Sequence, residues 1–158
     1  MDDDIQLVQN TTLECDTDCI IEDDKPPLIA PGDYWLGYLY HQTCILWGAP
    51  KLALWFTVLD DGDVHGTKLA RYYNVKSLLG PPRKYGQFRV RGWQGDFVTE
   101  YVTLFGEPDQ LKRVSLSPFK NVLIKGEIRT VTSNSKKHPI PDCLQRSVID
   151  RLISAKPA

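Results

Sequence analysis

The chain of 158 residues has 42% hydrophobic and 25% charged side chains, which suits one globular domain with a hydrophobic core and room for a tail. Its longest mainly apolar run, Leu52 to Leu59, is far too short to cross a bilayer, and its aspartate-rich start lacks the positive and apolar regions of a signal peptide. These features argue against a membrane or secreted protein, so we expect a cytoplasmic chain without membrane contact. Its four cysteines are then expected to be free thiols.

The net charge of −1 hides a division of charge along the sequence. Residues 1–25 hold nine acids and one base, a charge of −8, whereas residues 26–158 hold 18 bases and 11 acids, a charge of +7. Within residues 64–95 there are seven bases and no acid, and residues 112–137 hold seven bases against Glu127 alone. One-signed stretches of this length attract phosphate, so the division predicts a polyanionic partner or a tail that masks its own domain.

In chain order, the first predicted element is an acidic, flexible arm over residues 1–27. Residues 34–41 then read as an aromatic-rich strand with a kinked continuation to residue 47, and Gly48–Pro50 reads as a turn. Two further strands are expected over residues 51–59 and 67–75, joined by a hairpin turn at Asp60–Asp63. In the second strand, either the even or the odd positions can form the core face.

The second half of the chain predicts two helices with a strand between them. Asp96 caps a helix that runs through residue 105, where the helix ends before Gly106. Residues 121–132 predict one long strand, or two strands that break at Gly126. Residues 141–154 predict a C-terminal helix, since a capping-box spacing precedes an apolar stripe made of Leu144, Val148 and Leu152.

This order of elements is typical of the oligonucleotide-binding (OB) fold, a five-stranded Greek-key barrel. We therefore expect a mainly β fold, an OB-like five-stranded barrel with one inserted helix and a C-terminal helix. The domain is predicted to cover residues 28–158, after the acidic arm of residues 1–27.

Basic and aromatic residues concentrate on the second and third predicted strands and in the loop that follows them. In OB domains these strands form much of the binding face, where aromatic rings stack on unpaired bases and cations follow the phosphates. We therefore predict a nucleic-acid-binding set of ten residues. It consists of Trp55, Lys68, Arg71, Tyr73, Arg83, Lys84, Tyr85, Arg89, Arg91 and Trp93.

Four stretches of the sequence support this reading through a resemblance: Ile29–Tyr34, Leu54–Phe56, Arg71–Val75, and Ser115–Phe119 continuing to Thr130. In them the chain resembles small proteins encoded by phages, plasmids and integrative elements, thought to be OB-fold proteins related to phage single-stranded-DNA-binding proteins. The similarity covers residues 28–153 and leaves out the arm. It implies a single-stranded-DNA-binding function in replication or recombination of a mobile genetic element, although phage binders of this kind usually carry their acidic tail at the C-terminus.

We expect no enzyme, since the sequence contains no phosphate-binding glycine loop, nucleophile elbow or zinc-protease motif. No cofactor or metal is predicted either. A nuclease remains an alternative that would use the polar group Asp60, Asp61, Asp63 and His65.

A further alternative is a protein-interaction module, an inhibitor or adaptor that acts on a host nucleic-acid machine. Its arm would mimic DNA, and Trp35, Trp47 and Trp93 would anchor the partner. In the nucleic-acid reading, the arm instead masks the basic domain or recruits a replication, recombination or defence protein. Because small OB proteins often pair through exposed strand edges, a homodimer is a further alternative.

Overall fold

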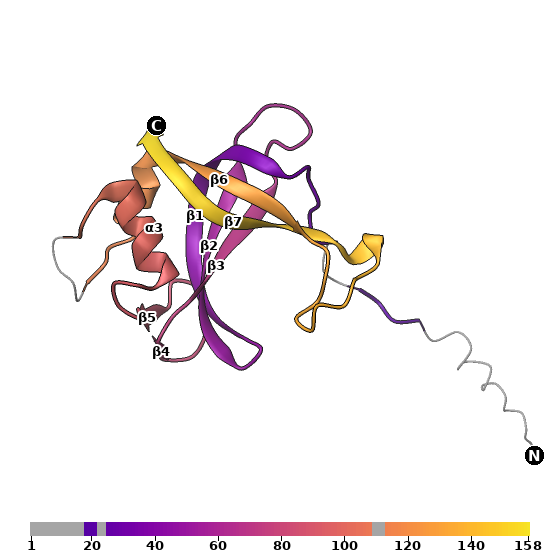
Figure 1. Ribbon diagram of the computed structural model, residues 1–158, viewed down its shortest axis with the longest axis horizontal. Coiled ribbons are helices and arrows are strands. Elements are labelled where there is room, and N and C mark those ends of the chain that lie inside the picture. Colours follow the sequence, from indigo (N-terminus) through magenta and orange to yellow (C-terminus); the bar gives the residue numbers. More distant parts are fainter. Residues whose placement is uncertain (1–17, 22–24, 109–112) are drawn as a thin grey trace, which may run out of the picture.

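The computed structural model describes residues 18–21, 25–108 and 113–158, and its fold is mainly β. A five-stranded antiparallel sheet has the strand order β3-β2-β1-β6-β7, and β4 pairs with β5 in a small second sheet (Figure 1). The strands are β1 (Gly32–Leu46), β2 (Ala49–Val58), β3 (Lys68–Asn74), β4 (Ser77–Leu79), β5 (Gln87–Arg89), β6 (Val122–Val131) and β7 (Arg146–Pro157). The helices are α3 (Asp96–Phe105) and the short 3-10 helices η2 (Ser117–Asn121) and η3 (Asp142–Leu144).

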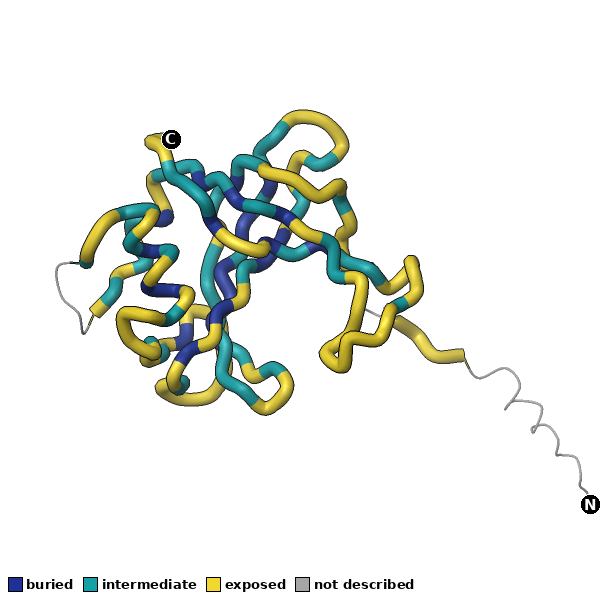
Figure 2. The backbone as a smooth tube through the Cα atoms, viewed as in Figure 1, coloured by how far each residue is buried: buried dark blue, intermediate teal, exposed yellow. Residues whose placement is uncertain are grey.

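The first three predicted strands are confirmed as the antiparallel meander β1-β2-β3. The core face of β2 consists of its even positions, since Leu52, Leu54, Phe56 and Val58 are fully buried. Antiparallel partners share a face, so the β3 residues opposite Leu52 and Leu54, which are Tyr73 and Arg71, also point inward. Figure 2 shows the buried residues along these central strands, while the connecting loops are exposed.

Strand β1 contains a bulge at Leu39 that changes which residues point outward. Before the bulge, Leu36 is buried and Tyr38 packs against the core ring of Phe56. The register shifts between Tyr38 and Tyr40, and Tyr40 then lies opposite Trp55 on the outer side of the sheet. The irregularity of this strand is therefore a bulge at Leu39, inside residues 34–41 and ahead of the predicted kinked continuation, and even-numbered residues face outward after it.

The β1–β2 turn has two residues, Trp47 and Gly48, because Leu46 pairs directly with Ala49. The predicted turn at Gly48–Pro50 is thus one residue too late. Both turn residues have positive φ angles, 52° for Trp47 and 76° for Gly48, as a type I′ hairpin turn requires. Glycine adopts this conformation freely, whereas tryptophan is strained there.

The five-stranded sheet does not close into the predicted barrel, because in the described part of the chain β3 and β7 share no hydrogen-bonded ladder. A carboxylate from α3 bridges the two strands instead. Glu100 Oε1 accepts hydrogen bonds from Tyr73 Oη of β3 at 2.8 Å and from Leu152 N of β7 at 3.0 Å. Arg71 of β3 forms an ion pair with the same carboxylate.

The predicted C-terminal helix is wrong, since residues 146–157 form β7 and only the 3-10 turn η3 follows Pro141. The ladder with β6 skips Asp150 and Ile153, so β7 carries two bulges. Buried Ile149 and Leu152 therefore lie three residues apart, a spacing that imitates a helical stripe. The backbone N–H and C=O groups at the edge of β6 pair with residues 146–157, and they would lack these partners if those residues formed a helix. This long-range pairing decides that residues 146–157 form a strand.

The inserted helix α3 is confirmed over Asp96–Phe105, but its N-cap is Gly95, one residue before the predicted cap Asp96. It ends as predicted at Gly106, whose N–H bonds to Val102 O. Its buried residues Phe97 and Tyr101 join the aromatic core around Phe119. No helix within residues 18–21, 25–108 and 113–158 is both long enough and apolar enough to span a membrane.

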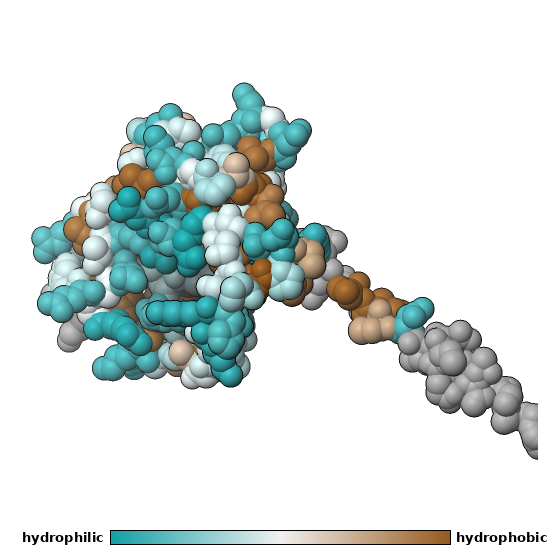
Figure 3. All heavy atoms as spheres, turned by 45° about the vertical axis from the view of Figure 1, so that its right-hand side comes forward, coloured by the Kyte–Doolittle hydropathy of each residue, from teal (hydrophilic) through white to brown (hydrophobic). Residues whose placement is uncertain are grey.

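Ahead of β1, the chain contacts the domain from Pro27 onward. Ser147 N of β7 donates to Pro27 O at 2.9 Å, and the Ser147 hydroxyl accepts from Ile29 N at 2.8 Å. Residues 18–21 project from the domain, and Ile20 and Ile21 are 81% and 85% exposed (Figure 3). The predicted arm lies largely outside the described residues.

Candidate nucleic-acid interface

The outward side of β1, β2 and β3 gathers aromatic and basic side chains, and we call it the outer face. Its cross-strand pairs include Tyr40 with Trp55 and Cys44 with Lys51 between β1 and β2, and Lys68 with Thr57 between β3 and β2. The remaining side of these strands forms the core. The outer face is defined here by Tyr40, Gln42, Lys51, Trp55, Lys68, Tyr72 and Lys84.

The centre of the outer face is a pair of stacked rings from neighbouring strands. Tyr40 and Trp55 have centroids 6.2 Å apart and ring planes 23° from parallel. Trp55 Nε1 donates to Gln42 Oε1 at 3.2 Å, which fixes the orientation of the indole. Both rings are only half-buried, so part of the pair is accessible to solvent.

The loop after β4 places a lysine over the tyrosine of this pair. Backbone bonds from Thr43 N to Arg83 O and from Tyr85 N to His41 O, both 2.9 Å, join the loop to β1. A Cβ at Gly86 would overlap Thr43 Oγ1, so this close approach requires glycine. Lys84 Nζ consequently lies 4.3 Å from the Tyr40 ring centroid and 5.5 Å from that of Tyr85.

His41 supports this loop from below. Its Nε2 lies 3.0 Å from Gly86 O, and its ring meets Tyr85 and Phe88 edge to face. Burial lowers the His41 pKa, the hydrogen bond to Gly86 O raises it, and the charge of Lys120 lowers it, with a net decrease. The imidazole is therefore neutral near pH 7, where it holds the loop as an uncharged partner.

The β1–β2 turn extends the outer face at one end. The Trp47 side chain is 75% exposed, and Lys51 Nζ lies 6.0 Å from its ring centroid. Lys51 also bonds Asn74 Oδ1 across the β2–β3 ladder. An exposed tryptophan in a strained turn, beside a lysine, extends the aromatic and basic surface beyond the sheet.

The structure brings four predicted site residues together on or beside this surface: Trp55, Lys68, Lys84 and Tyr85. Arg83 is exposed in the same loop, and its carbonyl anchors the loop to Thr43. The backbone of Arg83 thus holds the loop in place, while its side chain is accessible to a ligand.

Two predicted site residues, Arg71 and Tyr73, lie on the opposite, inward side. Tyr73 is 1% exposed, and the Arg71 side chain is 13% exposed in its ion pair with Glu100. Burial raises the Tyr73 pKa, reinforced by the Glu100 charge. In this conformation neither side chain can meet a base or a phosphate, so we leave both out of the candidate interface.

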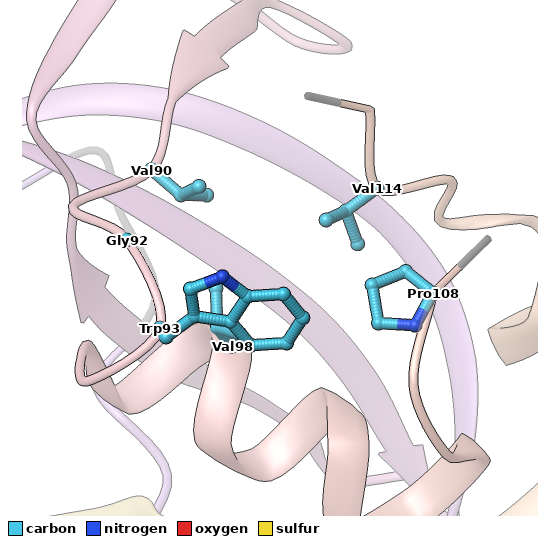
Figure 4. Close-up of a pocket in the computed structure, with 6 residues that line it drawn as sticks. All are labelled: Val90, Gly92, Trp93, Val98, Pro108 and Val114. Carbon is cyan, nitrogen blue, oxygen red and sulfur yellow. The ribbon is translucent and has the colours of Figure 1, made fainter. Parts of the chain in front are cut away.

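The remaining predicted residues are also exposed: Arg89 ends β5, whereas Arg91 and Trp93 lie on another surface, just before the start of α3. The Trp93 side chain, 47% exposed, lines a small apolar pocket. Figure 4 shows the indole beside Val98, with Val90 on one side of the pocket and Pro108 and Val114 on the other. No described contact links Trp93 to the Tyr40–Trp55 pair.

The polar group suggested for a nuclease stabilises the β2–β3 loop. Asp60 Oδ1 accepts a hydrogen bond from Trp35 N at 2.8 Å, and His65 Nδ1 lies 3.2 Å from Leu59 O. Among the described residues no three His, Cys, Asp or Glu side chains are grouped so that they could hold a metal ion. The predicted hairpin turn at Asp60–Asp63 is part of a longer loop over residues 59–67.

Four members of the outer face were missed by the sequence reasoning: Tyr40, Gln42, Lys51 and Tyr72. For Tyr72 and Lys51 the signal was strand alternation, because they take the parity of Trp55 in the β2–β3 ladder. For Tyr40 no local signal exists, since the bulge at Leu39 reverses the alternation of β1.

No protein-family model, curated protein or solved structure matches the chain. The resemblance to phage-type proteins therefore stays a hypothesis.

Proposed function

We propose that this chain is a non-enzymatic protein that binds single-stranded nucleic acid, with DNA favoured, on its outer face. The observation that carries the proposal is the stacked pair of Tyr40 and Trp55 with the Lys84 ammonium 4.3 Å above the tyrosine. Exposed rings stack on unpaired bases with about 1–3 kcal/mol per base, and a neighbouring lysine neutralises the phosphate between bases.

The strand order supports an OB-like architecture for this function. OB folds are partly open five-stranded barrels that bind through strands two and three and through the loops after strands one and four. Here β2 and β3 carry Trp55, Lys68 and Tyr72, the β1–β2 turn carries Trp47, and the β6–β7 loop carries two exposed lysines. The two loops and the two strands thus offer aromatic or basic groups at the positions this architecture uses.

The acidic arm fits the same proposal as a competitor of the ligand. A segment of charge −8 attached to a domain of charge +7 can occupy the outer face until nucleic acid displaces it, or recruit a replication, recombination or defence protein. Deletion of residues 1–25 should then raise the affinity for an oligonucleotide at low salt. An unchanged affinity and salt dependence would exclude masking.

The experiment that tests the binding proposal is fluorescence anisotropy of a labelled oligothymidine, titrated at low and moderate salt. Trp55→Leu should weaken binding by about tenfold, within the range for one lost stacking partner, and all binding should fall steeply with salt. Trp93→Leu is the matched control, because it removes a partly exposed tryptophan from the other surface. Equal affinities for the two variants would contradict the proposed face.

A protein-interaction module is the second candidate, and the exposed side chains of Trp47, Ile20 and Ile21 favour it. Tryptophan is frequent at interface hot spots, and isoleucines exposed in a projecting segment can anchor a partner. The same titration separates the candidates, since a chain that binds no oligonucleotide, with or without residues 1–25, would be assigned to this class.

A further inference from the structure

A second cluster of an aromatic ring and lysines lies on β1, five residues before Tyr40. Trp35 is half-buried on the outward side of β1, directly opposite Lys125 of β6. Lys156 Nζ of β7 lies 4.0 Å from the Trp35 ring centroid and Lys125 Nζ lies 5.6 Å from it. Three different strands therefore supply this cluster, which we call the Trp35 site.

The Trp35 site holds two positive charges beside one ring, and neither lysine is paired with the nearby Asp60 carboxylate, which accepts a hydrogen bond from Trp35 N. Among the described residues neither Lys125 nor Lys156 forms an ion pair. The nearest outward carboxylate on β6, Glu127, is paired with Arg151 at 2.7 Å. Two like charges beside one ring repel each other, and a bound anion reduces that repulsion.

The surface between the Trp35 site and the outer face is apolar, because the side chains of Leu59 and Thr57 flank Gly37 there. The outward position of β1 between Trp35 and the bulge is Gly37, which has no side chain, and the residue opposite it is Thr57. Five residues of strand separate Trp35 from Tyr40, a path of about 16 Å. A bound strand that continues along β1 therefore meets the two lysines several nucleotides away from the Tyr40–Trp55 pair.

We infer that the Trp35 site is a second phosphate-binding station for the same single strand, so that the ligand follows the direction of β1. This inference rests on the proposed function, because it extends the path of the proposed ligand. It assigns phosphodiester contacts to Lys125 and Lys156, positions that sequence analysis left outside the binding set. It also sets a minimum ligand length below which these lysines make no contact.

The test compares a short oligothymidine of about four nucleotides with a long one of about sixteen, the range of site sizes for one OB domain. The double variant Lys125→Gln/Lys156→Gln should bind the long oligonucleotide about tenfold more weakly than the unmodified protein, with a salt slope smaller by about 1.4. The short oligonucleotide should bind both proteins equally. Each variant is compared with the unmodified protein at the same length, which removes the statistical advantage of longer ligands.

The matched control is Arg129→Gln/Arg151→Gln. It removes two charges from the same two strands, but these arginines are already paired with Asp150 and Glu127. An effect of equal size in both double variants, or an equal loss for both oligonucleotide lengths, would overturn the second station in favour of a general charge effect. If the unmodified protein bound neither oligonucleotide, the proposed function itself would fail.

Discussion

Two pairs of a cation and an aromatic ring in this domain have the same cation-to-centroid distance and opposite environments. Arg71 Cζ lies 4.3 Å from the Tyr73 ring centroid, and Lys84 Nζ lies 4.3 Å from that of Tyr40. The first pair faces inward and is neutralised by Glu100, whereas the second faces outward and has no described ion-pair partner. Spacing in the sequence does not separate a structural pair from a binding pair; strand parity and the nearby carboxylate do.

The inward pair links three elements through one carboxylate. Glu100 of α3 accepts hydrogen bonds from Arg71 and Tyr73 of β3 and from the backbone of Leu152 in β7. Burial lowers the Arg71 pKa, but its hydrogen bond to Glu100 and the nearby charges raise it more, with a net increase. The cluster compensates for the missing ladder between the two strands, so it belongs to the stability of the domain.

The largest effect is therefore expected from Glu100→Ala. The change leaves the Arg71 guanidinium, the Tyr73 hydroxyl and the Leu152 amide without their acceptor, and it should lower the free energy of unfolding by about 3 kcal/mol. Urea denaturation followed by tryptophan fluorescence measures this loss. Folded protein should retain its oligonucleotide affinity, and a variant of full stability would show that the cluster does not hold β3 and β7 together.

Lys84→Gln changes the outward pair, and it should affect nucleic-acid binding and not stability. The side chain is exposed, so we expect the free energy of unfolding to change by no more than about 0.5 kcal/mol. Loss of one phosphate contact should reduce the salt slope of oligonucleotide binding by about 0.7. The control is Arg71→Gln, with the opposite pattern: a clear loss of stability and an unchanged salt slope in the folded protein. If Lys84→Gln lowered the stability and Arg71→Gln reduced the salt slope, the Lys84 pair would be structural and the Arg71 pair would bind the ligand.

Trp47→Asn sharpens the comparison, because it should separate stability from binding. Asparagine tolerates the positive φ of the type I′ turn, so replacement of the strained tryptophan should raise the free energy of unfolding by about 0.5–1 kcal/mol. The same change removes an exposed ring and should weaken oligonucleotide binding. A variant that is more stable and binds as well as the unmodified protein would remove Trp47 from the interface.

The smallest effect is expected from protonation of His41 beneath the binding loop. Its pKa in the folded protein is below the ordinary value of 6.5, so the unfolded chain binds the proton more readily. Stability is then full above about pH 6.5 and falls as the pH decreases through the interval between the two pKa values. Urea midpoints at several pH values should show this decrease in the unmodified protein and a smaller one in His41→Gln. Parallel curves would exclude His41 as the source.

Local patterns in the sequence determined much of this protein: the mainly β class, the strands β1, β2, β3 and β6, the helix α3 and the division of charge. These features depend on alternation, turn residues and composition, which neighbouring residues fix among themselves. Trp55, Lys68 and Lys84 could be chosen for the candidate surface because cations and aromatic rings concentrate on those strands and the following loop.

Only the tertiary structure decided which side of each strand faces solvent and how the chain ends. The bulge at Leu39 shifts β1 by one residue and brings Tyr40 to the outer face, and bulges at Asp150 and Ile153 give β7 the spacing of a helix. The role of Arg71 depends on Glu100, 29 residues away. A bulge has no reliable local signature, and pairing between distant strands, not local propensity, sets register and conformation there.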